Sequence, residues 1–150
     1  MKIAMIGQKG IPTQYGGVEK HVQELAVRVA RNSDHEIIAF TRPWYSPKHK
    51  TSYKGIKLVS LPSIKSKHLD AISHTFVSIL HAAFKEKVDV FHIHAVGPSL
   101  LAWLPRIVRP RAKVVVTFHC IDRQHQKWGG FARLMLWLGE LSAMKFAHQI

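Results

Sequence analysis

The sequence of 150 residues contains one cysteine and lacks a long apolar run. Cys120 therefore has no partner for an internal disulfide, which suits a reducing compartment. No stretch approaches the roughly 18 apolar residues that a membrane-spanning helix needs. The apolar start at residues 1–6 is also much shorter than the core of a secretory signal. We therefore expect a cytoplasmic chain that folds as one domain, 1–150, with 47% hydrophobic residues to build its core.

Acidic residues are scarce as well: 9 Asp and Glu stand against 22 Lys and Arg, which gives a net charge of +13. Such a surface attracts phosphorylated substrates, anionic lipid or nucleic acid, because net charge governs partners rather than fold. The cations gather at 48–67 and 106–113, interleaved with aromatic and aliphatic residues, as at an interfacial membrane anchor. The alternative is a solvated basic face with tryptophans in the core. The residues predicted to face an anionic membrane are Trp44, Tyr45, Lys48, Lys50, Arg106, Arg109 and Arg111.

Apolar runs alternate with helical patterns along the whole chain, which is typical of successive βαβ units. This predicts an α/β fold with a doubly wound, Rossmann-like parallel sheet. Helices are expected from Val18 to the Asn-Ser-Asp cluster at 32–34, over 69–83, over 99–108 and over 131–146, where the stripe should be well buried. Pro105 is expected to bend or shorten the third of them. Residues 43–54 are expected to be an irregular loop. The predicted strands are 2–6, 36–41, 56–61, 88–93 and 113–118.

The first predicted strand ends in a glycine-rich loop that leads into the first helix. Lys9 precedes Gly10 with no Gly-Lys-Ser/Thr in place, so the loop is not that of a nucleoside-triphosphatase, and its spacing does not fit the dinucleotide fingerprint. No Ser, Thr, Asp or Asn stands directly before Val18 to cap the helix, and Gly16 and Gly17 carry no side chains to keep a ligand away. The loop therefore predicts a phosphate at the helix N-terminus. The alternative is that the glycines serve turn geometry only.

Histidines follow two of the predicted strands at the carboxyl edge, where open parallel sheets bind their ligands. His92 and His94 alternate onto one side of a strand, but with His119 and Asp122 they do not form a recognised zinc spacing, so no metal is predicted. His94 is expected to order the loop before Pro98, and His119 to hydrogen-bond a substrate. For both histidines, the alternative to these functional roles is a purely structural role. Asp122 and Lys127 continue this rim.

Several motifs together resemble the N-terminal half of bacterial retaining glycosyltransferases of family four, especially the rhamnosyltransferase-like branch. The resemblance spans the whole chain, and the opening motif and the Thr-x-His element are its more specific parts. Cys120 and Ile121 depart from the pattern, in which a glycine and a varied residue are common. The matching segments are residues 1–7, Gly10-Ile11-Pro12, Tyr15-Gly16-Gly17-Val18-Glu19, residues 89–94 with Gly97-Pro98, and Thr117-Phe118-His119 through Lys127-Trp128-Gly129.

The resemblance implies one half of a two-domain glycosyltransferase of the B type, in which this domain chiefly serves the acceptor. Gly16 and Gly17 would approach the diphosphate of a nucleotide-sugar, and His119 would contact the transferred hexose or deoxyhexose. The residues that would belong to the acceptor side or its loops are Lys9, Tyr15, Glu19, His94, Asp122 and Lys127. No cofactor or metal is expected, and the acceptor would be a cell-surface polysaccharide or a lipid-linked glycan.

The second domain, which would carry the nucleotide pocket, is expected to be absent from this chain, so the chain alone should lack turnover. A peripheral position at the inner face of the cytoplasmic membrane is also expected. The competing hypothesis is a non-catalytic basic module for anionic membrane or nucleic acid. The ordered loop motifs disfavour it, because simple electrostatic binding does not need them. The sugar, the nucleotide, the linkage and the oligomeric state leave no mark in this sequence.

Overall fold

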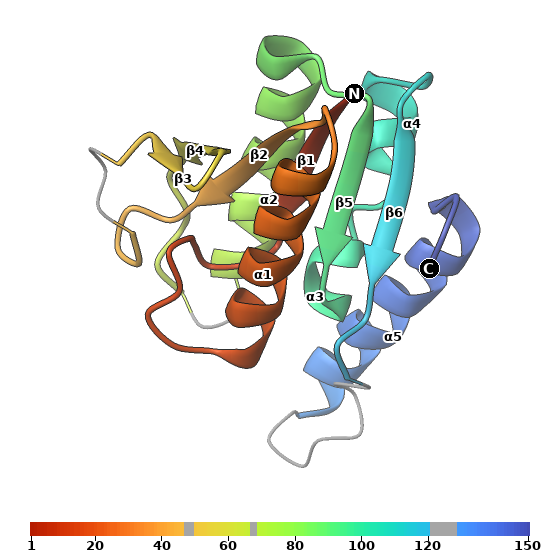
Figure 1. The fold of residues 1–150 in the computed structure, drawn as a ribbon. Helices are drawn as coiled ribbons and strands as arrows, with labels where there is room; N and C mark the ends of the chain where they lie inside the picture. Colours follow the sequence, from red (N-terminus) through yellow and green to blue (C-terminus); the bar gives the residue numbers. More distant parts are fainter. Residues whose placement is uncertain (47–49, 67–68, 121–128) are drawn as a thin grey trace.

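A computed structural model describes residues 1–150 except 47–49, 67–68 and 121–128. Its centre is a six-stranded sheet in the order β3-β4-β2-β1-β5-β6, in which every neighbouring pair is parallel except β3 with β4 (Figure 1). The parallel strands are buried runs rich in Val and Ile, as expected of a sheet covered on both faces. The strands are β1 (Lys2–Ile6), β2 (Glu36–Thr41), β3 (Ser52–Tyr53), β4 (Ile56–Ser60), β5 (Val90–His94) and β6 (Lys113–Thr117).

Helices lie on both faces of this sheet, so the predicted doubly wound fold is confirmed. On one face α1 (Gly17–Asn32) packs Val22 and Ala26 against alternate residues of β1 and β2. The other residues of these strands face a second core, built with α2 (Asp70–His81) and the π-helical turn η1 (Ala82–Glu86). The short helix α4 (Leu104–Val108) and α5 (Gly130–Phe146) complete that core.

Two predicted elements differ in the structure. The segment 43–54 contains the short strand β3, whose two residues are too few to leave a periodic pattern. The helix expected over 99–108 is instead two short helices, α3 (Val96–Ser99) and α4. Pro105 lies in the first turn of α4, where a missing N–H costs no helical hydrogen bond, so it does not bend a longer helix. Within the described residues, no helix is long and apolar enough to cross a bilayer.

The expectation that α5 is well buried is wrong. Its buried side is made of Leu136 and three small residues, Gly139, Ser142 and Ala143, and a Cβ on Gly139 would collide with the backbone of Val96. The hydroxyl of Ser99 on α3 donates to the carbonyl of Gly139 at 3.0 Å. Because this approach requires small residues inside, the large apolar stripe faces outward. Its exposed members are Phe131, Leu134, Trp137, Leu141 and Met144, with Phe131 76% exposed.

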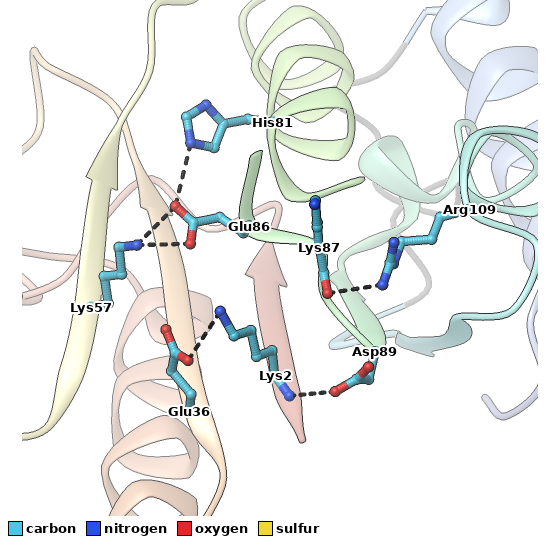
Figure 2. A network of polar contacts seen from close by, with 8 residues as sticks. All are labelled: Lys2, Glu36, Lys57, His81, Glu86, Lys87, Asp89 and Arg109. Atoms are coloured by element: carbon cyan, nitrogen blue, oxygen red, sulfur yellow. Dashed lines mark hydrogen bonds and ion pairs between the residues drawn. The ribbon is translucent and has the colours of Figure 1, made fainter. Parts of the chain in front are cut away.

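The amino edge of the sheet, where the parallel strands begin, carries a set of paired charges (Figure 2). Lys57, at the start of β4, holds both carboxylate oxygens of Glu86 at 2.9 and 2.7 Å. His81 lies 3.5 Å from the same carboxylate. Lys2 pairs with Glu36 at 3.4 Å across the starts of β1 and β2. These contacts join elements from both halves of the sheet at the end opposite the glycine loop.

Candidate functional site

The glycine loop connects β1 to the N-terminus of α1, and its glycines have different reasons to be glycine. Gly7 and Gly16 have φ values of +111° and +106°, which side chains rarely adopt. A Cβ would also collide with the backbone of His94 at Gly7 and with the carboxylate of Glu19 at Gly16. Around a Cβ at Gly17, by contrast, there is nothing within 4 Å. The fold therefore requires Gly7 and Gly16, but the described structure gives no packing reason for Gly17.

Tyr45 holds the glycine loop in place. The prediction that Tyr45 faces a membrane is therefore wrong. Tyr45 is 2% exposed, and its hydroxyl accepts hydrogen bonds from the backbone N–H groups of Gln14 and Tyr15, each at 2.9 Å. The same hydroxyl donates to the carbonyl of Tyr15 at 2.6 Å. The ring of Tyr15 meets that of Tyr45 edge-on, 5.0 Å between centroids. Tyr45 is therefore a structural clasp for the glycine loop.

The other loop residues named from the sequence gather around this clasp. Glu19, in the first turn of α1 and only 6% exposed, accepts the backbone N–H of Lys9 at 3.3 Å. The ammonium of Lys9 lies 5.1 Å from the centre of the Tyr15 ring. No side chain caps α1 at Gly16, so the first amides of the helix keep no side-chain acceptor there. The loop is thus held by Tyr45 and Glu19, and the N-terminus of α1 keeps amides without a side-chain cap, which favour an anion.

A column of histidines lies beside this helix N-terminus. The ring of His94 lies tilted against that of His92 at 4.1 Å and stacks on that of His119 at 5.6 Å between centroids. His21 of α1 meets His119 edge-on at 5.0 Å. His92 shares a hydrogen bond of 2.8 Å with the hydroxyl of Thr117 on the neighbouring strand. His94 is fully buried, and neither of its ring nitrogens has a hydrogen-bond partner in the protein. The ends of β5 and β6 thus lie beside α1.

Burial favours the neutral forms of His92 and His94 in this column. Burial, reinforced by the charges of His119 and His21, lowers the pKa of His92 to about 4. Burial also holds the pKa of His94 well below the usual value, with His92 as the next cause. In the part of the chain that the structure describes, no three His, Cys, Asp or Glu side chains are grouped so as to hold a metal ion. The column therefore offers uncharged rings for packing and hydrogen bonding.

Comparison with known proteins identifies the family of this chain. The model of Glycosyltransferase Family 4 matches residues 15–150. The chain belongs to this family. Among solved structures, it is similar to the sucrose-phosphate synthase from Thermosynechococcus elongatus, with a TM-score of 0.67 and 17% identity. That match covers 91% of this chain and 39% of the synthase, so the family 4 chain spans well under half of that protein's length. A search of curated proteins returns no match.

The structural match confirms the fold class of the family 4 chain, a Rossmann-like unit of the glycosyltransferase B type. Among the site residues named from the sequence, Asp122, Lys127 and Lys48 lie outside the described residues. The other predicted catalytic, donor and acceptor residues lie together at the carboxyl edge of the sheet, at the ends of β1, β5 and β6 and the start of α1. They are Gly16, Gly17, Lys9, Tyr15, Glu19, His94 and His119.

The residues predicted to face a membrane do not form one surface. Arg109 is engaged with the backbone at the amino edge, where its guanidinium donates to the carbonyls of Val88 at 2.6 Å and Lys87 at 3.0 Å (Figure 2). Arg106 contacts the ring of His148, and Arg111 is exposed. Trp44 instead follows the carboxyl end of β2 and is 41% exposed. Lys50, near Trp44 in the chain, lies 5.1 Å from the centre of the Tyr53 ring.

Sequence reasoning missed a buried polar cluster next to the glycine loop. Arg42, 3% exposed, pairs with Asp70 at 3.2 Å, while its Nε and Nη2 atoms have no hydrogen-bond partner in the protein. Its backbone N–H donates to the carbonyl of Lys9 at 2.9 Å. Burial lowers the pKa of Arg42 against the opposing charges of Asp70 and Glu19. Burial and the nearby Arg42 lower the pKa of His74 to about 4. An arginine directly after a buried strand was the available signal.

Proposed function

We propose that this chain is the acceptor-side domain of a nucleotide-sugar-dependent glycosyltransferase. It transfers a hexose or deoxyhexose, with retention of configuration, to a cell-surface polysaccharide or lipid-linked acceptor. Membership of glycosyltransferase family 4 supports the reaction class. In this proposal a second domain supplies the nucleotide pocket, and neither a metal nor another cofactor takes part.

The observation that carries the proposal is the contrast between Gly16 and Gly17. The backbone requires a glycine at position 16, whereas at 17 the space around the missing side chain is open. Glycine at 17 lets a ligand approach the first amides of α1, which have no side-chain cap. These amides oppose the charge that develops on a departing diphosphate, and such stabilisation is often the largest single contribution to catalysis.

In this proposal the transferred sugar lies beside His119, which contacts α1 through the ring of His21. The ring of His119 is stacked on His94 and meets His21 edge-on, so its orientation is fixed by packing. In the proposal His119 hydrogen-bonds the sugar, and the acceptor hydroxyl is held on the face of the sugar that the diphosphate leaves. Replacing His119 by Ala should then reduce turnover by about 10²-fold in the enzyme completed by its nucleotide-binding domain. Normal turnover combined with a lower melting temperature would make His119 a structural residue.

The diphosphate site can be tested on the chain itself with pyrophosphate as the probe. We expect pyrophosphate to shift the backbone amide signals of Gly17 and Val18 in a heteronuclear NMR titration. Gly17→Val should weaken this binding at least tenfold while the fold survives, because the added side chain meets no protein atom at its Cβ.

The matched control is Gly130→Val, because Gly130 is the first residue of α5 and also has nothing within 4 Å of an added Cβ. This variant should bind pyrophosphate like the unmodified chain. Equal affinity in all three proteins, or shifts confined to α5, would reduce the glycine loop to a turn and remove the main support for the function.

We also propose that the protein works at the cytoplasmic face of the membrane. The support is the charge of +13 together with the exposed Trp44 and with Lys50 and Lys54, which follow it in the sequence. The chain should pellet with vesicles containing phosphatidylglycerol, stay free with neutral vesicles, and be released as salt screens the attraction. Replacing Lys50 and Lys54 by Ser should weaken this binding. If single-stranded nucleic acid competes much better than vesicles, the charge serves the basic-module alternative instead.

A further inference from the structure

A groove lies beside the start of α2, on the face of the sheet opposite α1. It has a volume of about 520 Å³ and is enclosed by the loop after β4, the first two turns of α2, and Leu101. Its lining is largely apolar: Ile64, Ile72, Phe76 and Val77 contribute, and Phe76 is 43% exposed. The volume falls within the usual range for small-molecule sites, which are also mostly apolar.

One end of this groove opens into a polar hollow. A connecting hollow shares Pro62 and Ser63 with the apolar groove, and shares Trp44 and Lys65 with a third hollow. That third hollow, of about 430 Å³, is completed by Ser66 and Asp70. Because they share these lining residues, the three hollows adjoin one another on the surface, and we call them together the α2 groove. It has an apolar end at Phe76 and a polar end at Lys65.

The charge at the polar end is positive. Asp70 is already engaged: its carboxylate pairs with Arg42 at 3.2 Å and accepts hydrogen bonds from Ser63 at 2.5 Å and Trp44 at 3.3 Å. Among the described residues, no carboxylate forms an ion pair with Lys65, which is exposed in the hollow. Behind Trp44, the guanidinium of Arg42 lies 5.9 Å from the indole ring. The polar end of the groove thus suits an anionic group.

The polar end also lies next to the proposed reaction site. Arg42 donates its backbone N–H to Lys9 of the glycine loop, and Tyr45, adjacent to Trp44, clasps the same loop through Tyr15. The apolar end runs away from this edge along α2. A ligand in the α2 groove would therefore hold its anionic head near the diphosphate site and its apolar tail against α2.

From this arrangement we infer that the α2 groove binds the acceptor, a glycan carried on a long-chain lipid phosphate, with the phosphate at Lys65 and the chain along Phe76. The inference rests on the proposed function and specifies its acceptor. It assigns Lys65 and Trp44 to the head group and the exposed apolar residues of α2 to the chain. An uncharged soluble glycan would use neither the free cation nor the apolar length of this groove.

Isothermal titration of the chain with dodecyl phosphate, below its micelle concentration, tests the inference. We expect saturable binding that is at least tenfold tighter than that of octyl phosphate, because four fewer methylene groups are buried. Inorganic phosphate should not compete at equal concentration. Dodecyl maltoside, which has the same chain and an uncharged head, should bind at least tenfold more weakly. Absence of binding, or equal affinity for octyl and dodecyl phosphate, would overturn the inference.

Variants with matched controls locate the site. Phe76→Glu and, separately, Ile64→Glu should each weaken dodecyl phosphate binding at least tenfold; both side chains are partly exposed, so the fold should survive in at least one variant. Lys65→Ser should weaken dodecyl phosphate but not dodecyl maltoside. The controls are Phe84→Glu and Lys85→Ser on η1, which lie outside the groove, and neither should change affinity.

A third control addresses the exposed stripe of α5, which also offers apolar surface. If Leu141→Glu abolishes binding and Phe76→Glu does not, the alkyl chain binds α5 and the inference is wrong. If the chain binds anionic vesicles but not monomeric dodecyl phosphate, it recognises a membrane surface and the inference of a lipid-binding groove is wrong. Pyrophosphate titration of the same variants separates the two proposals. If dodecyl phosphate does not bind but pyrophosphate still shifts the Gly17 amide signal, the acceptor is soluble and the glycosyltransferase assignment stands.

Discussion

The two edges of the sheet treat polar groups in opposite ways. At the amino edge the charged side chains are partly exposed and paired, as between Lys57 and Glu86 or Lys2 and Glu36. At the carboxyl edge, polar atoms of Gln8, Arg42 and His94 are buried without a partner in the protein. A buried polar group without a partner costs free energy, so native proteins keep few of them. The paired charges of the amino edge therefore contribute to folding, while the carboxyl edge retains most of these costly groups; Nδ1 of His35, directly before β2, is one such atom at the amino edge.

Acid should distinguish the two edges most strongly. The pKa values of His74 and His92 are lowered from 6.5 to about 4, so their neutral forms stabilise the fold fully above pH 6.5. This stability is lost as the pH falls from 6.5 toward 4, by about 3 kcal/mol for each of the two histidines. Urea unfolding at a series of pH values should show the loss, and His92→Asn should make the slope shallower by about one proton.

The amino edge should respond only in stronger acid. Although partial burial raises the pKa of Glu86, the hydrogen bonds and charge of Lys57 and His81 lower it below 4.5 overall. The contribution of this carboxylate is therefore present above pH 4.5 and lost below it. If the stability of the protein were constant from pH 7 to pH 4.5 and fell only below that, the contrast between the edges would be false.

Substitutions of glycine should separate backbone need from ligand access within the carboxyl edge. Gly7→Ala places a side chain at a φ of +111° and against the backbone of His94, which should lower the free energy of unfolding by about 3 kcal/mol. Gly17→Ala should leave it unchanged within about 0.5 kcal/mol. Chemical denaturation of both variants checks this. Comparable losses would mean that both glycines serve the fold alone.

Removing the hydroxyl of Tyr45 should have the next largest effect. Tyr45→Phe leaves the amides of Gln14 and Tyr15 without their acceptor, which should cost about 2 kcal/mol in the free energy of unfolding. Hydrogen exchange at these two amides should accelerate. The matched control is Tyr53→Phe on β3, whose ring contacts are with Lys50 and Lys54, and this change should cost less than about 0.5 kcal/mol. Unchanged exchange in Tyr45→Phe would show that the clasp does not hold the loop.

The smallest effect is expected at the amino edge. Lys57 is 47% exposed, and ion pairs with a partly exposed member contribute little, so Lys57→Ala should lower the free energy of unfolding by less than about 1 kcal/mol. The loss should shrink further at high salt. Thermal denaturation at two salt concentrations measures it. A loss larger than that of Tyr45→Phe would reverse the ranking of the two edges.

The sequence predicted the central strands well because a parallel sheet covered on both faces produces continuous apolar runs, as in β2 and β6. It predicted the stripe on α5 but not the side that the stripe faces. That choice depends on how closely Gly139 approaches α3, which is a contact between distant parts of the chain. The same limit applies to Tyr45. Its aromatic and basic neighbours in the sequence suggested a membrane contact, whereas its hydroxyl forms hydrogen bonds with residues 30 and 31 positions away in the chain.

The candidate site was predictable where it depended on local chain geometry. The glycine loop follows directly from a strand, glycines and a helix in succession, and His92 and His94 follow from the alternation of a strand. The Arg42 cluster could not be derived in this way. Its partner Asp70 stands 28 positions later, and His74 joins it only because α2 begins where it does.

The clasp between Tyr45 and the glycine loop has a thermodynamic consequence. Trp44 borders the α2 groove, its neighbour Tyr45 holds Tyr15, and Tyr15 immediately precedes Gly16 and Gly17. A ligand that shifts this segment changes the geometry of the first amides of α1, and a ligand on those amides changes the groove in return. Such coupling is reciprocal: each ligand alters the affinity for the other by the same factor. The two sites are thus linked through the hydroxyl of Tyr45, whichever ligand binds first.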